Sequence, residues 1–195
     1  VVVSNGTCSR TIGPITFNLP GSPVFTIAST DPTTCSGTNG CITLSGLTAS
    51  TIYTVVSSPA STGISSLNGT STSASGTYTH CNGISAGTYT VTVVSGACST
   101  SHQVIYHDPA AVAFSIVGND PTTCSGSDAC ITIGGLNPST VYTVSSSPAS
   151  AGINSISGTS SGSSGTYIHC GGISAGTYSV SVTLAGCTTC LLYTS

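Results

Sequence analysis

The chain has 195 residues and almost no charge: Arg10 is its only basic residue, its four acids are all Asp, and its formal net charge is −3. Proteins that bind nucleic acids neutralise the phosphate backbone with Lys and Arg, so this composition excludes a nucleic-acid-binding protein and argues against attachment to an anionic membrane surface. The sequence contains no run of 18 apolar residues, so no membrane-spanning helix is predicted.

The N-terminal residues look like the end of a repeat. Val1–Arg10 (VVVSNGTCSR) resembles Val91–Thr100 (VTVVSGACST), with one extra residue before the cysteine. We therefore predict that residues 1–12 are the tail strand of a preceding repeat. Cys8 corresponds to Cys98, and we expect its intra-repeat partner to belong to that preceding repeat.

The rest of the chain contains the same sequence twice. Asp31–Ser99 aligns with Asp120–Thr188 without a gap at an offset of 89 residues, and 44 of the 69 aligned positions are identical, which is typical of a repeat array. We predict a first repeat over residues 13–106 and a second over residues 107–189. Repeats of this length are of ordinary domain size, and a catalytic domain is seldom duplicated, so the pattern favours a structural array.

Each repeat shows the pattern of short β-strands. Gly, Pro and β-branched residues interrupt every helix-forming window, and turn residues separate segments of alternating polarity. In the first repeat these segments are Val24–Ser29, Cys41–Leu47, Thr51–Ser57, Gly76–Cys81 and Gly87–Ser95, and the second repeat echoes each of them. Short strands at this spacing predict an all-β fold of antiparallel β-sandwich domains.

The connecting segments carry two further expectations. Residues 69–75 (GTSTSAS) and 158–164 (GTSSGSS) contain no apolar side chain larger than Ala, which predicts exposed loops. Ser101–Ala111 joins the repeats; its segment Val104–Tyr106 can extend a strand and its proline restricts the backbone, so we predict a stiff connector.

Tyr89 and Tyr178 stand at the start of the last long strand of their repeats. This placement suggests a tyrosine corner, in which the ring packs inward and the hydroxyl bonds back to the chain. An ordinary strand tyrosine is the alternative interpretation.

Each repeat contributes four cysteines, for which three pairings are possible. Cys35 follows the first strand and Cys98 lies at the last one, so a bond between them would join the two ends of a domain, where it best resists pulling. Cys41 opens the second strand and Cys81 closes an internal one. The predicted disulfides are Cys35–Cys98, Cys41–Cys81, Cys124–Cys187 and Cys130–Cys170. Disulfides persist in oxidising compartments, which predicts an extracellular protein.

A metal site is the alternative use of these thiols. The pairs His80-Cys81 and His169-Cys170 each place an imidazole beside a thiol. Five residues separate Cys35 from Cys41, however, which is wider than the spacing of two to four in common zinc sites. The chain also has no Lys, so a Lys–Asn isopeptide crosslink cannot form and covalent reinforcement must come from cysteine. We therefore favour disulfides and predict no metal and no cofactor.

The sequence contains no HExxH or P-loop motif, and its four Asp do not form an evident pair of catalytic carboxylates, so we predict that it is not an enzyme. Asn5 and Asn68 begin N-x-S/T sequons and are candidate glycosylation sites, whereas the sequon at Asn137 is blocked by the following proline. The Ser/Thr-rich loops are candidates for O-linked sugars.

The residues Cys190–Ser195 (CLLYTS) break the repeat pattern, which at Ser101 runs SHQVIY. The codons TGT CTC TTA TAC ACA TCT encode these residues and match the end of a transposon used in DNA library preparation. We therefore predict a non-native, adapter-derived tail over residues 190–195 and assign Cys190 no function. A genuine hydrophobic tail is the alternative.

The repeat motif resembles a known family. It reads DPTTC-SG-x-x-x-C-ITLSGL from Asp31, continues through YTV, and closes with GISAGTYTVTV and GAC. This pattern is similar to the tandem Ig-like repeats of very large secreted surface adhesins and filament proteins of Bacteroidota (flavobacteria-type), including gliding-motility adhesins. The resemblance implies disulfide-stapled Ig-like β-sandwich domains, export by the type IX secretion route, and a role in adhesion or fibre building at the cell surface. Family repeats often carry one cysteine pair, so the additional Cys41 and Cys81 indicate a hardened fibre.

Together these patterns predict a structural repeat unit of an extracellular filament, stalk or giant surface adhesin. Its partners would be copies of itself or adjacent repeats in a fibre, with covalent glycans as a coat. The alternative is a carbohydrate- or surface-binding adhesion module. Sugar-binding sites usually stack aromatic rings on the sugar, and this chain has no Trp, eight Tyr and three Phe, several at strand positions that predict core packing.

Overall fold

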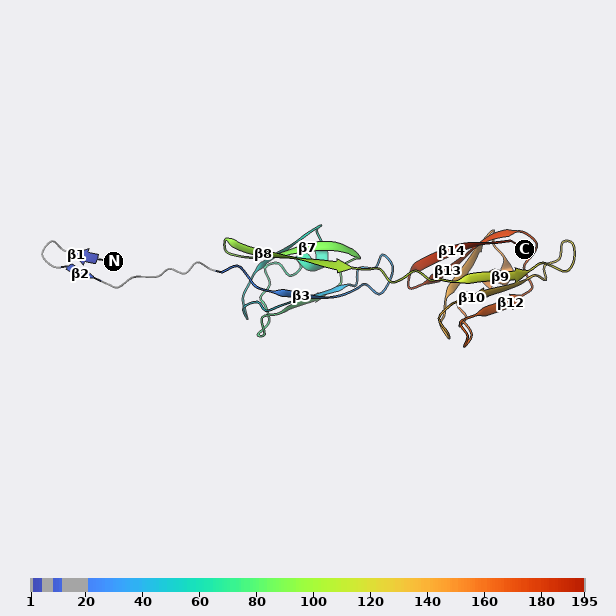
Figure 1. Cartoon of the computed structure of the whole chain (residues 1–195), viewed down its shortest axis with the longest axis horizontal. Coiled ribbons are helices and arrows are strands. Elements are labelled where there is room, and N and C mark those ends of the chain that lie inside the picture. The colour runs from blue at the N-terminus through green and yellow to red at the C-terminus, as the bar shows by residue number, and fades with distance from the viewer. Residues whose placement is uncertain (1, 5–8, 12–20, 195) are drawn as a thin grey trace. The chain divides into compact units, whose positions relative to one another are not determined.

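The computed structural model describes residues 2–4, 9–11 and 21–194 of the chain (Figure 1). Near the N-terminus, β1 (Val2–Ser4) and β2 (Ser9–Thr11) pair as an antiparallel hairpin. This hairpin lies in the segment that we predicted to be the tail of a preceding repeat. Cys8 and Asn5 lie outside the described residues.

The first repeat folds into two three-stranded antiparallel sheets. Its strands are β3 (Thr26–Thr30), β4 (Cys41–Ser45), β5 (Thr54–Ser58), β6 (Tyr78–Cys81), β7 (Gly87–Ser95) and β8 (Cys98–Tyr106). One sheet has the order β3-β4-β6 and the other has the order β5-β7-β8. Because β8 runs to Tyr106, most of the predicted connector is the last strand of this repeat.

The second repeat forms the same two sheets, in the orders β12-β10-β9 and β11-β13-β14. Its strands are β9 (Ser115–Asn119), β10 (Cys130–Gly134), β11 (Thr143–Ser147), β12 (Tyr167–Cys170), β13 (Thr177–Leu184) and β14 (Cys187–Thr194). In chain order the strands of each repeat correspond to A, B, C, E, F and G of an Ig domain, with ABE in one sheet and CFG in the other. The predicted all-β fold of antiparallel sandwich domains is confirmed.

Alternation along the strands buries one face of each sheet. In β10, Ile131 and Ile133 are fully buried on either side of the half-buried Thr132, and in β13 Val180 and Val182 are fully buried. These side chains from the two sheets meet in one hydrophobic cluster. Burying an aliphatic side chain of this size contributes about 1.5–3 kcal/mol, so the period-2 pattern is the main source of the fold's stability.

Two single-turn helices, α1 (Thr62–Ser65) and α2 (Ala151–Asn154), were not predicted. Ser150 caps α2 by accepting a hydrogen bond from the Ile153 amide, and Ile153 is fully buried. A single turn is too short to show helical periodicity in a sequence and too short to be stable alone, so it depends on the cap and on the buried side chain. In the part of the chain that the structure describes, no helix is long and apolar enough to cross a membrane.

We predicted that the two Ser/Thr-rich tracts, residues 69–75 and 158–164, are exposed loops, but each of them contains a buried residue. Thr72 is 4% exposed and Ser161 is 3% exposed. The Thr72 hydroxyl donates to the carbonyl oxygen of Thr48 (2.6 Å) and accepts from the amide of Thr51 (2.9 Å). Ser161 makes the two equivalent bonds in the second repeat. A small hydroxyl can be buried when both its donor and its acceptor are used, and composition alone does not reveal this.

The C-terminal residues belong to the second sandwich. Residues 190–194, predicted to be an adapter-derived tail, continue β14, so the predicted end of the second repeat at residue 189 falls within a strand. Tyr193 is 6% exposed in the core cluster, and its hydroxyl donates to the carbonyl oxygen of Cys130 (3.3 Å). Strand pairing uses backbone groups and needs only alternating polarity, so a segment that departs from the repeat sequence can still complete the sheet.

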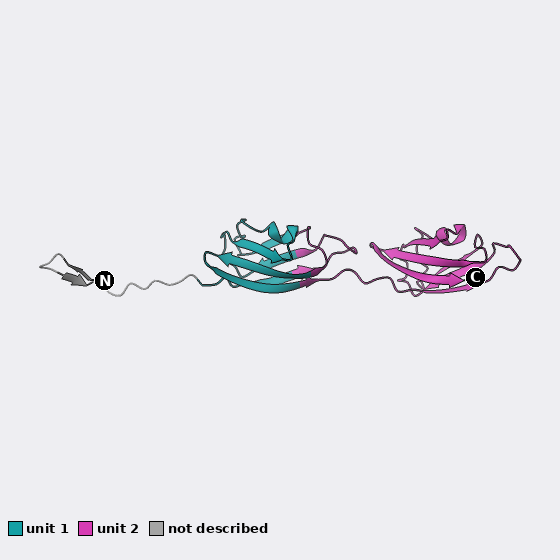
Figure 2. Cartoon of the chain, turned by 90° about the horizontal axis from the view of Figure 1, so that it is seen from above, with its two compact units in different colours: residues 1–28, 42–80, 88–104 teal, residues 29–41, 81–87, 105–195 magenta. Residues whose placement is uncertain are grey.

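The described residues form two compact units that do not follow the boundary between the repeats (Figure 2). Unit 1 contains the described residues up to Ala28 together with Ile42–His80 and Thr88–Val104. Unit 2 contains Ser29–Cys41, Cys81–Gly87 and the described residues from Ile105 onward. The loops after β3 and β6 of the first repeat therefore belong to the same unit as the second repeat.

Candidate functional site

Two disulfides each join neighbouring strands of one sheet. Cys130 and Cys170 are directly opposite in the antiparallel pairing of β10 with β12, and their Cα atoms are 4.0 Å apart. Cys41 in β4 and Cys81 in β6 form the equivalent bond, with Cα atoms 4.1 Å apart. The sequence analysis proposed these two pairs. Each bond staples one sheet and does not join the two sheets, unlike the disulfide of antibody domains.

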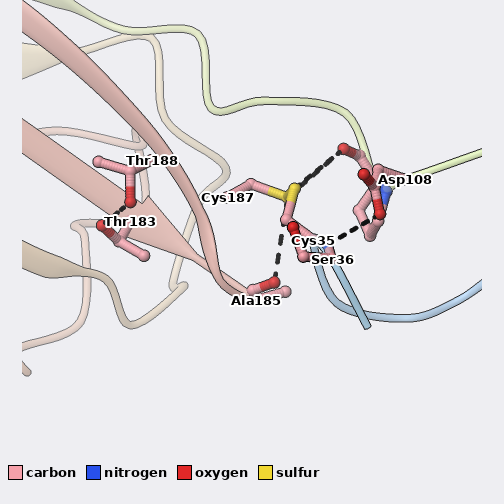
Figure 3. Close-up of a disulfide and its surroundings, with 8 residues drawn as sticks. Cys35, Ser36, Asp108, Thr183, Ala185, Cys187 and Thr188 are labelled. Carbon is pink, nitrogen blue, oxygen red and sulfur yellow. Dashed lines mark hydrogen bonds between the residues drawn. A yellow bond between two sulfur atoms is a disulfide. The ribbon is translucent and has the colours of Figure 1, made fainter. Parts of the chain in front are cut away.

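The third disulfide, Cys35–Cys187, joins the first sequence repeat to the second (Figure 3). The two Cα atoms are 5.0 Å apart and the residues are 152 positions apart in the sequence. The predicted pairs Cys35–Cys98 and Cys124–Cys187 are therefore wrong. Cys98 and Cys124 are thiols.

The length of β8 explains why Cys35 does not pair with Cys98. Cys98 begins this strand, whereas the loop of Cys35 lies beside residues that follow its end. The Ser36 amide donates to Oδ1 of Asp108 (3.0 Å), and Sγ of Cys35 lies 3.7 Å from the carbonyl oxygen of Pro109. A strand rises about 3.3 Å per residue, so the ends of this nine-residue strand are roughly 26 Å apart. A disulfide requires Cα atoms within about 7 Å.

Backbone contacts hold the bridging loop against the turn before β14. The amide of Cys35 donates to the carbonyl oxygen of Ala185 at 2.9 Å (Figure 3). Sγ of Cys187 lies 3.4 Å from the carbonyl oxygen of Pro109. The loop, the segment after β8 and the turn before β14 therefore converge on one disulfide.

The segment after β8 adds a second polar contact. The His107 amide donates to Oδ1 of Asp31 (3.0 Å), and its Nδ1 lies 3.5 Å from Oδ2 of the same carboxylate. The two side chains are 70% and 50% exposed, so an ion pair between them contributes little to stability. The backbone bond, which does not depend on the charge of His107, is the contact that orients the segment.

In the second repeat, the loop equivalent to that of Cys35 is Asp120–Asp128. The side chain of Asp128 stabilises this loop through hydrogen bonds. Its Oδ2 accepts a short hydrogen bond from the Thr122 hydroxyl, and its Oδ1 accepts from the Thr122 amide (3.1 Å). These bonds favour the carboxylate over the acid and hold the pKa of Asp128 below its ordinary value of 3.8. In the first repeat Asn39 has the same position and accepts from the Thr33 amide (3.0 Å). The hydrogen bond that holds the loop is therefore formed both by the charged Asp128 and by the neutral Asn39.

The candidate metal ligands of the sequence analysis were the neighbouring pairs His80-Cys81 and His169-Cys170. Cys81 and Cys170, the cysteines of these pairs, are disulfide-bonded. The ring nitrogens of His169 each lie 3.4 Å from Oγ of Ser155. Among the described residues, no three His, Cys, Asp or Glu side chains are grouped so that they could hold a metal ion.

The second repeat contains a tyrosine corner. The Tyr178 hydroxyl donates to the carbonyl oxygen of Ser174 at 2.9 Å, and the side chain is 7% exposed. The corner interpretation is therefore confirmed at Tyr178. Tyr89, at the equivalent position, is likewise buried.

Each repeat has a small cleft at equivalent positions, of about 270 Å³ in the first and 280 Å³ in the second. Tyr53 is the aromatic residue in the lining of the first cleft and Tyr142 in that of the second. Both rings are buried, and the Tyr53 hydroxyl accepts from the Thr48 amide (3.2 Å). These rings pack in the core and do not present a face on which a sugar could stack.

Asn68, the sequon residue in the described part of the chain, is exposed, as an attachment site needs to be. Its Oδ1 accepts from the Val55 amide (3.3 Å). Ser157 has the equivalent position and makes the equivalent bond to the Val144 amide (3.1 Å). The position therefore has a structural role that the second repeat keeps without a sequon.

Comparison with known proteins found no matching family model and no matching curated protein. Among solved structures, the structure of surface layer protein SbsC, domains 1–6, matches with a TM-score of 0.34 and 14% sequence identity. The match covers 89% of this chain, which spans 28% of the length of that structure.

Proposed function

We propose that this chain is a structural segment of an extracellular filament, stalk or large surface adhesin, in which consecutive repeats are joined by disulfides as well as by the peptide chain. The observation that carries the proposal is the Cys35–Cys187 bond between the two repeats. Disulfides persist outside the reducing cytosol, which supports an extracellular location. The resemblance of the repeat motif to Bacteroidota surface proteins supports the same function.

The inter-repeat bond changes which residues can bear tension. When the chain is pulled from its two ends, the load passes from Cys35 to Cys187 through the sulfur atoms and bypasses the residues between them. Closing a loop of this size lowers the entropy of the unfolded chain, which stabilises the fold by about 5 kcal/mol in the chain-entropy model. A protein linked in this way resists extension, as a load-carrying fibre must.

The near absence of charge fits self-association. Soluble domains usually stay apart because of their net charge, and this chain has a formal charge of only −3. Copies of the chain or adjacent repeats are therefore the proposed partners. Glycans on the sequons at Asn5 and Asn68, or on the Ser/Thr-rich segments, would be the proposed coat where the surface is not covered by a neighbour.

The proposal is tested on native material. An antibody against the second repeat should label fibres or stalks on the cell surface, and the intact mass of the extracted protein, with and without reduction, should show oxidised cysteines. The same measurement after deglycosylation reports the glycan load. A compact, monodisperse monomer as the full-length native product, or an intracellular protein with reduced cysteines, would overturn the proposal.

A further inference from the structure

We propose that the loop after β9 is a docking site for a further repeat of the same type, joined in the polypeptide to the C-terminal side of the second repeat. The site consists of three groups: the carboxylate of Asp120, the thiol of Cys124 and the backbone amide of Ser125. The incoming repeat bonds the thiol through the cysteine at the start of its last strand. This inference rests on the proposed function and deepens it by naming the surface that receives a repeat.

The first repeat shows what these three groups bind. At the offset of 89 residues, their counterparts are Asp31, Cys35 and Ser36. The Asp31 carboxylate and the Ser36 amide each form a hydrogen bond to the segment after β8, and Cys35 forms the disulfide to the last strand of the second repeat. All three counterparts therefore bind the repeat that comes after them in the chain.

The Cys124 loop already has the conformation of the bonded Cys35 loop. Both loops read DPTTCSG, and in each the amide of the glycine donates to the carbonyl oxygen of the second threonine at 2.9 Å. Ser125 and Ser36 have left-handed φ angles of 63° and 56°. The loop does not have to be reordered when it binds, and preorganisation of this kind lowers the cost of association.

The two loops differ in how much of them is covered. Cys35 is half-buried and Pro32 is buried, whereas Cys124 is exposed and Pro121 is half-buried. The loop of Cys124 faces a hollow of about 390 Å³, which is lined by Asp120–Ser125 and Ala175. All three groups of the site are therefore in one open hollow, which has room for the side chains of a partner.

The position of β14 explains why a repeat joined to it reaches this hollow. In its sheet β14 pairs with β13 as β8 pairs with β7, and it runs to Thr194, the counterpart of Ile105. A repeat joined with the same spacing brings its counterparts of His107 and Asp108 to Asp120 and to the loop amides. Because the connection is covalent, the repeat is present at a high effective concentration and weak polar contacts suffice to orient it.

The bonded loop also shows which kind of turn the site accepts. The Cys35 amide donates to the carbonyl oxygen of Ala185 at 2.9 Å, and a Cβ added at Gly186 would lie 3.4 Å from the Cys35 carbonyl oxygen. The turn before β14 therefore lies against the backbone of the loop. A partner suits the Cys124 loop when two small residues precede its cysteine.

The bond forms by thiol oxidation. The thiols of Cys124 and of the incoming cysteine each lose a proton and together lose two electrons to a low-molecular-weight disulfide, such as oxidised glutathione. That oxidant is reduced to two thiols, and one new S–S bond joins the two Sγ atoms through a mixed-disulfide intermediate.

The test extends the full chain by a second copy of residues 107–194, placed directly after Ser195 so that the repeat spacing is kept. Cys190→Ser is made in both copies, because Ser101 has this position in the first repeat. In the added copy, Cys124→Ser leaves one Cys124 in the protein, and Thr188→Ser marks the neighbouring Cys187 peptide by its mass.

After oxidation of the dilute protein in a glutathione buffer, peptide mass analysis should find Cys124 joined to the marked Cys187 peptide. The same digest should contain Cys35 joined to the unmarked Cys187 peptide. Because the two loops have the same conformation, the glutathione ratio at which half of each bond is open should agree within about tenfold.

A matched control moves the thiol within the same exposed loop. Ser127 is exposed, so the second repeat carries Cys124→Ser together with Ser127→Cys. A covalent connection alone raises the concentration of the incoming cysteine near both positions, whereas docking brings it to position 124. The yield of the bond at position 127 should therefore be lower by about tenfold or more.

Two outcomes in the folded extended chain would overturn the inference: Cys124 found as a thiol or as a glutathione adduct, or equal bonding by the Ser127→Cys control. Circular dichroism checks the folding of both proteins. If Cys35–Cys187 is present and the Cys124 bond is missing, the docking site fails and the proposed function stands. If Cys35–Cys187 is missing as well, the proposed function also fails.

Protein extracted from its native source decides the question if the added copy does not fold. There Cys124 should be disulfide-bonded, and reduction should release no separate chain or small thiol from it. A free thiol at Cys124, a bound small thiol, or a second polypeptide released by reduction would each overturn the inference.

Discussion

At the scale of single residues, short side chains with oxygen atoms hold the loops and fill polar positions in the core. Asp128 and Asn39 brace equivalent loops by accepting from threonine amides, and the hydroxyl of Thr72 is buried with both of its hydrogen-bonding functions used. Among the described residues, no buried side-chain nitrogen or oxygen lacks a hydrogen-bond partner. Buried polar groups left unpaired would each cost about 1–3 kcal/mol, so this complete pairing lets a Ser/Thr-rich chain keep a defined fold.

Replacing Asp128 by Asn is expected to remove the pH dependence of the Cys124 loop while keeping its brace. Because hydrogen bonds from Thr122 lower the pKa of Asp128, they stabilise the loop fully above the ordinary value of 3.8 and are lost as the pH falls through the lowered value. An amide keeps the bond to the backbone, as Asn39 does. An NMR titration of the Thr122 amide should show a transition below pH 3.8 in the wild type and none in Asp128→Asn. A transition that persists in the variant would contradict the assignment, and the Thr33 amide serves as the internal control.

Truncation of Tyr193 tests whether the C-terminal residues are part of the fold. Tyr193 is buried in the core cluster, so Tyr193→Ala should destabilise the second repeat by about 3–5 kcal/mol. Tyr193→Phe loses the bond to the Cys130 carbonyl and should cost about 1 kcal/mol. Leu192 is 78% exposed, so Leu192→Ala should change stability by less than about 0.5 kcal/mol. Urea unfolding measures all three, and equal stability of Tyr193→Ala and Leu192→Ala would show that the strand is dispensable.

At the scale of secondary structure elements, the strands form from their own alternation, whereas the single-turn helices depend on their surroundings. In α2 the Ser150 hydroxyl both accepts from the Ile153 amide and donates to the carbonyl oxygen of Gly172 (3.0 Å). It therefore ties the helix to the loop after β12. Ile153 is fully buried, so α2, which follows β11 and precedes β12 in the chain, also contributes to the core.

Removal of the Ser150 cap is expected to loosen α2 and to leave the sheets in place. Ser150→Ala should cost about 1 kcal/mol because the Ile153 amide loses its acceptor. Hydrogen exchange of the Ile153 amide should accelerate, while the amides of β13 stay protected. Ser145→Ala, at an exposed position of β11, is the matched control and should leave the exchange of Ile153 unchanged. Equal acceleration in both variants would mean that the cap does not hold the helix.

At the scale of the whole molecule, three disulfides combine into one covalent network. Cys41–Cys81 and Cys130–Cys170 lie within the segment that Cys35–Cys187 closes, and each of them closes a further loop of 40-residue separation. Cys35–Cys187 therefore limits the extension of the two repeats together, and the other two disulfides each limit the extension of one repeat. This nesting supports the proposal of a load-bearing segment.

Single-molecule force spectroscopy should measure the length of chain that each disulfide prevents from extending. In the oxidised chain pulled from its ends, the segment between Cys35 and Cys187 should not extend. In Cys35→Ser the two cross-strand disulfides remain closed, so about 70 residues should be released, or roughly 250 Å at the full extension of the chain. Reduction of all bonds should release the whole 152-residue separation, roughly 500 Å. Cys98→Ser should behave like the wild type, and release of 250 Å in that control would place the load path elsewhere.

The amino-acid sequence by itself determined the sandwich fold and the two cross-strand disulfides. Strand alternation is local, and Cys130 and Cys170 stand at positions of neighbouring strands that pairing brings together. The partner of Cys35, the burial of Thr72 and the place of Tyr193 in the core were decided only by tertiary structure. The physical reason is distance. The two ends of β8 are roughly 26 Å apart, and only the folded structure shows that the loop of Cys35 lies at the end opposite to Cys98.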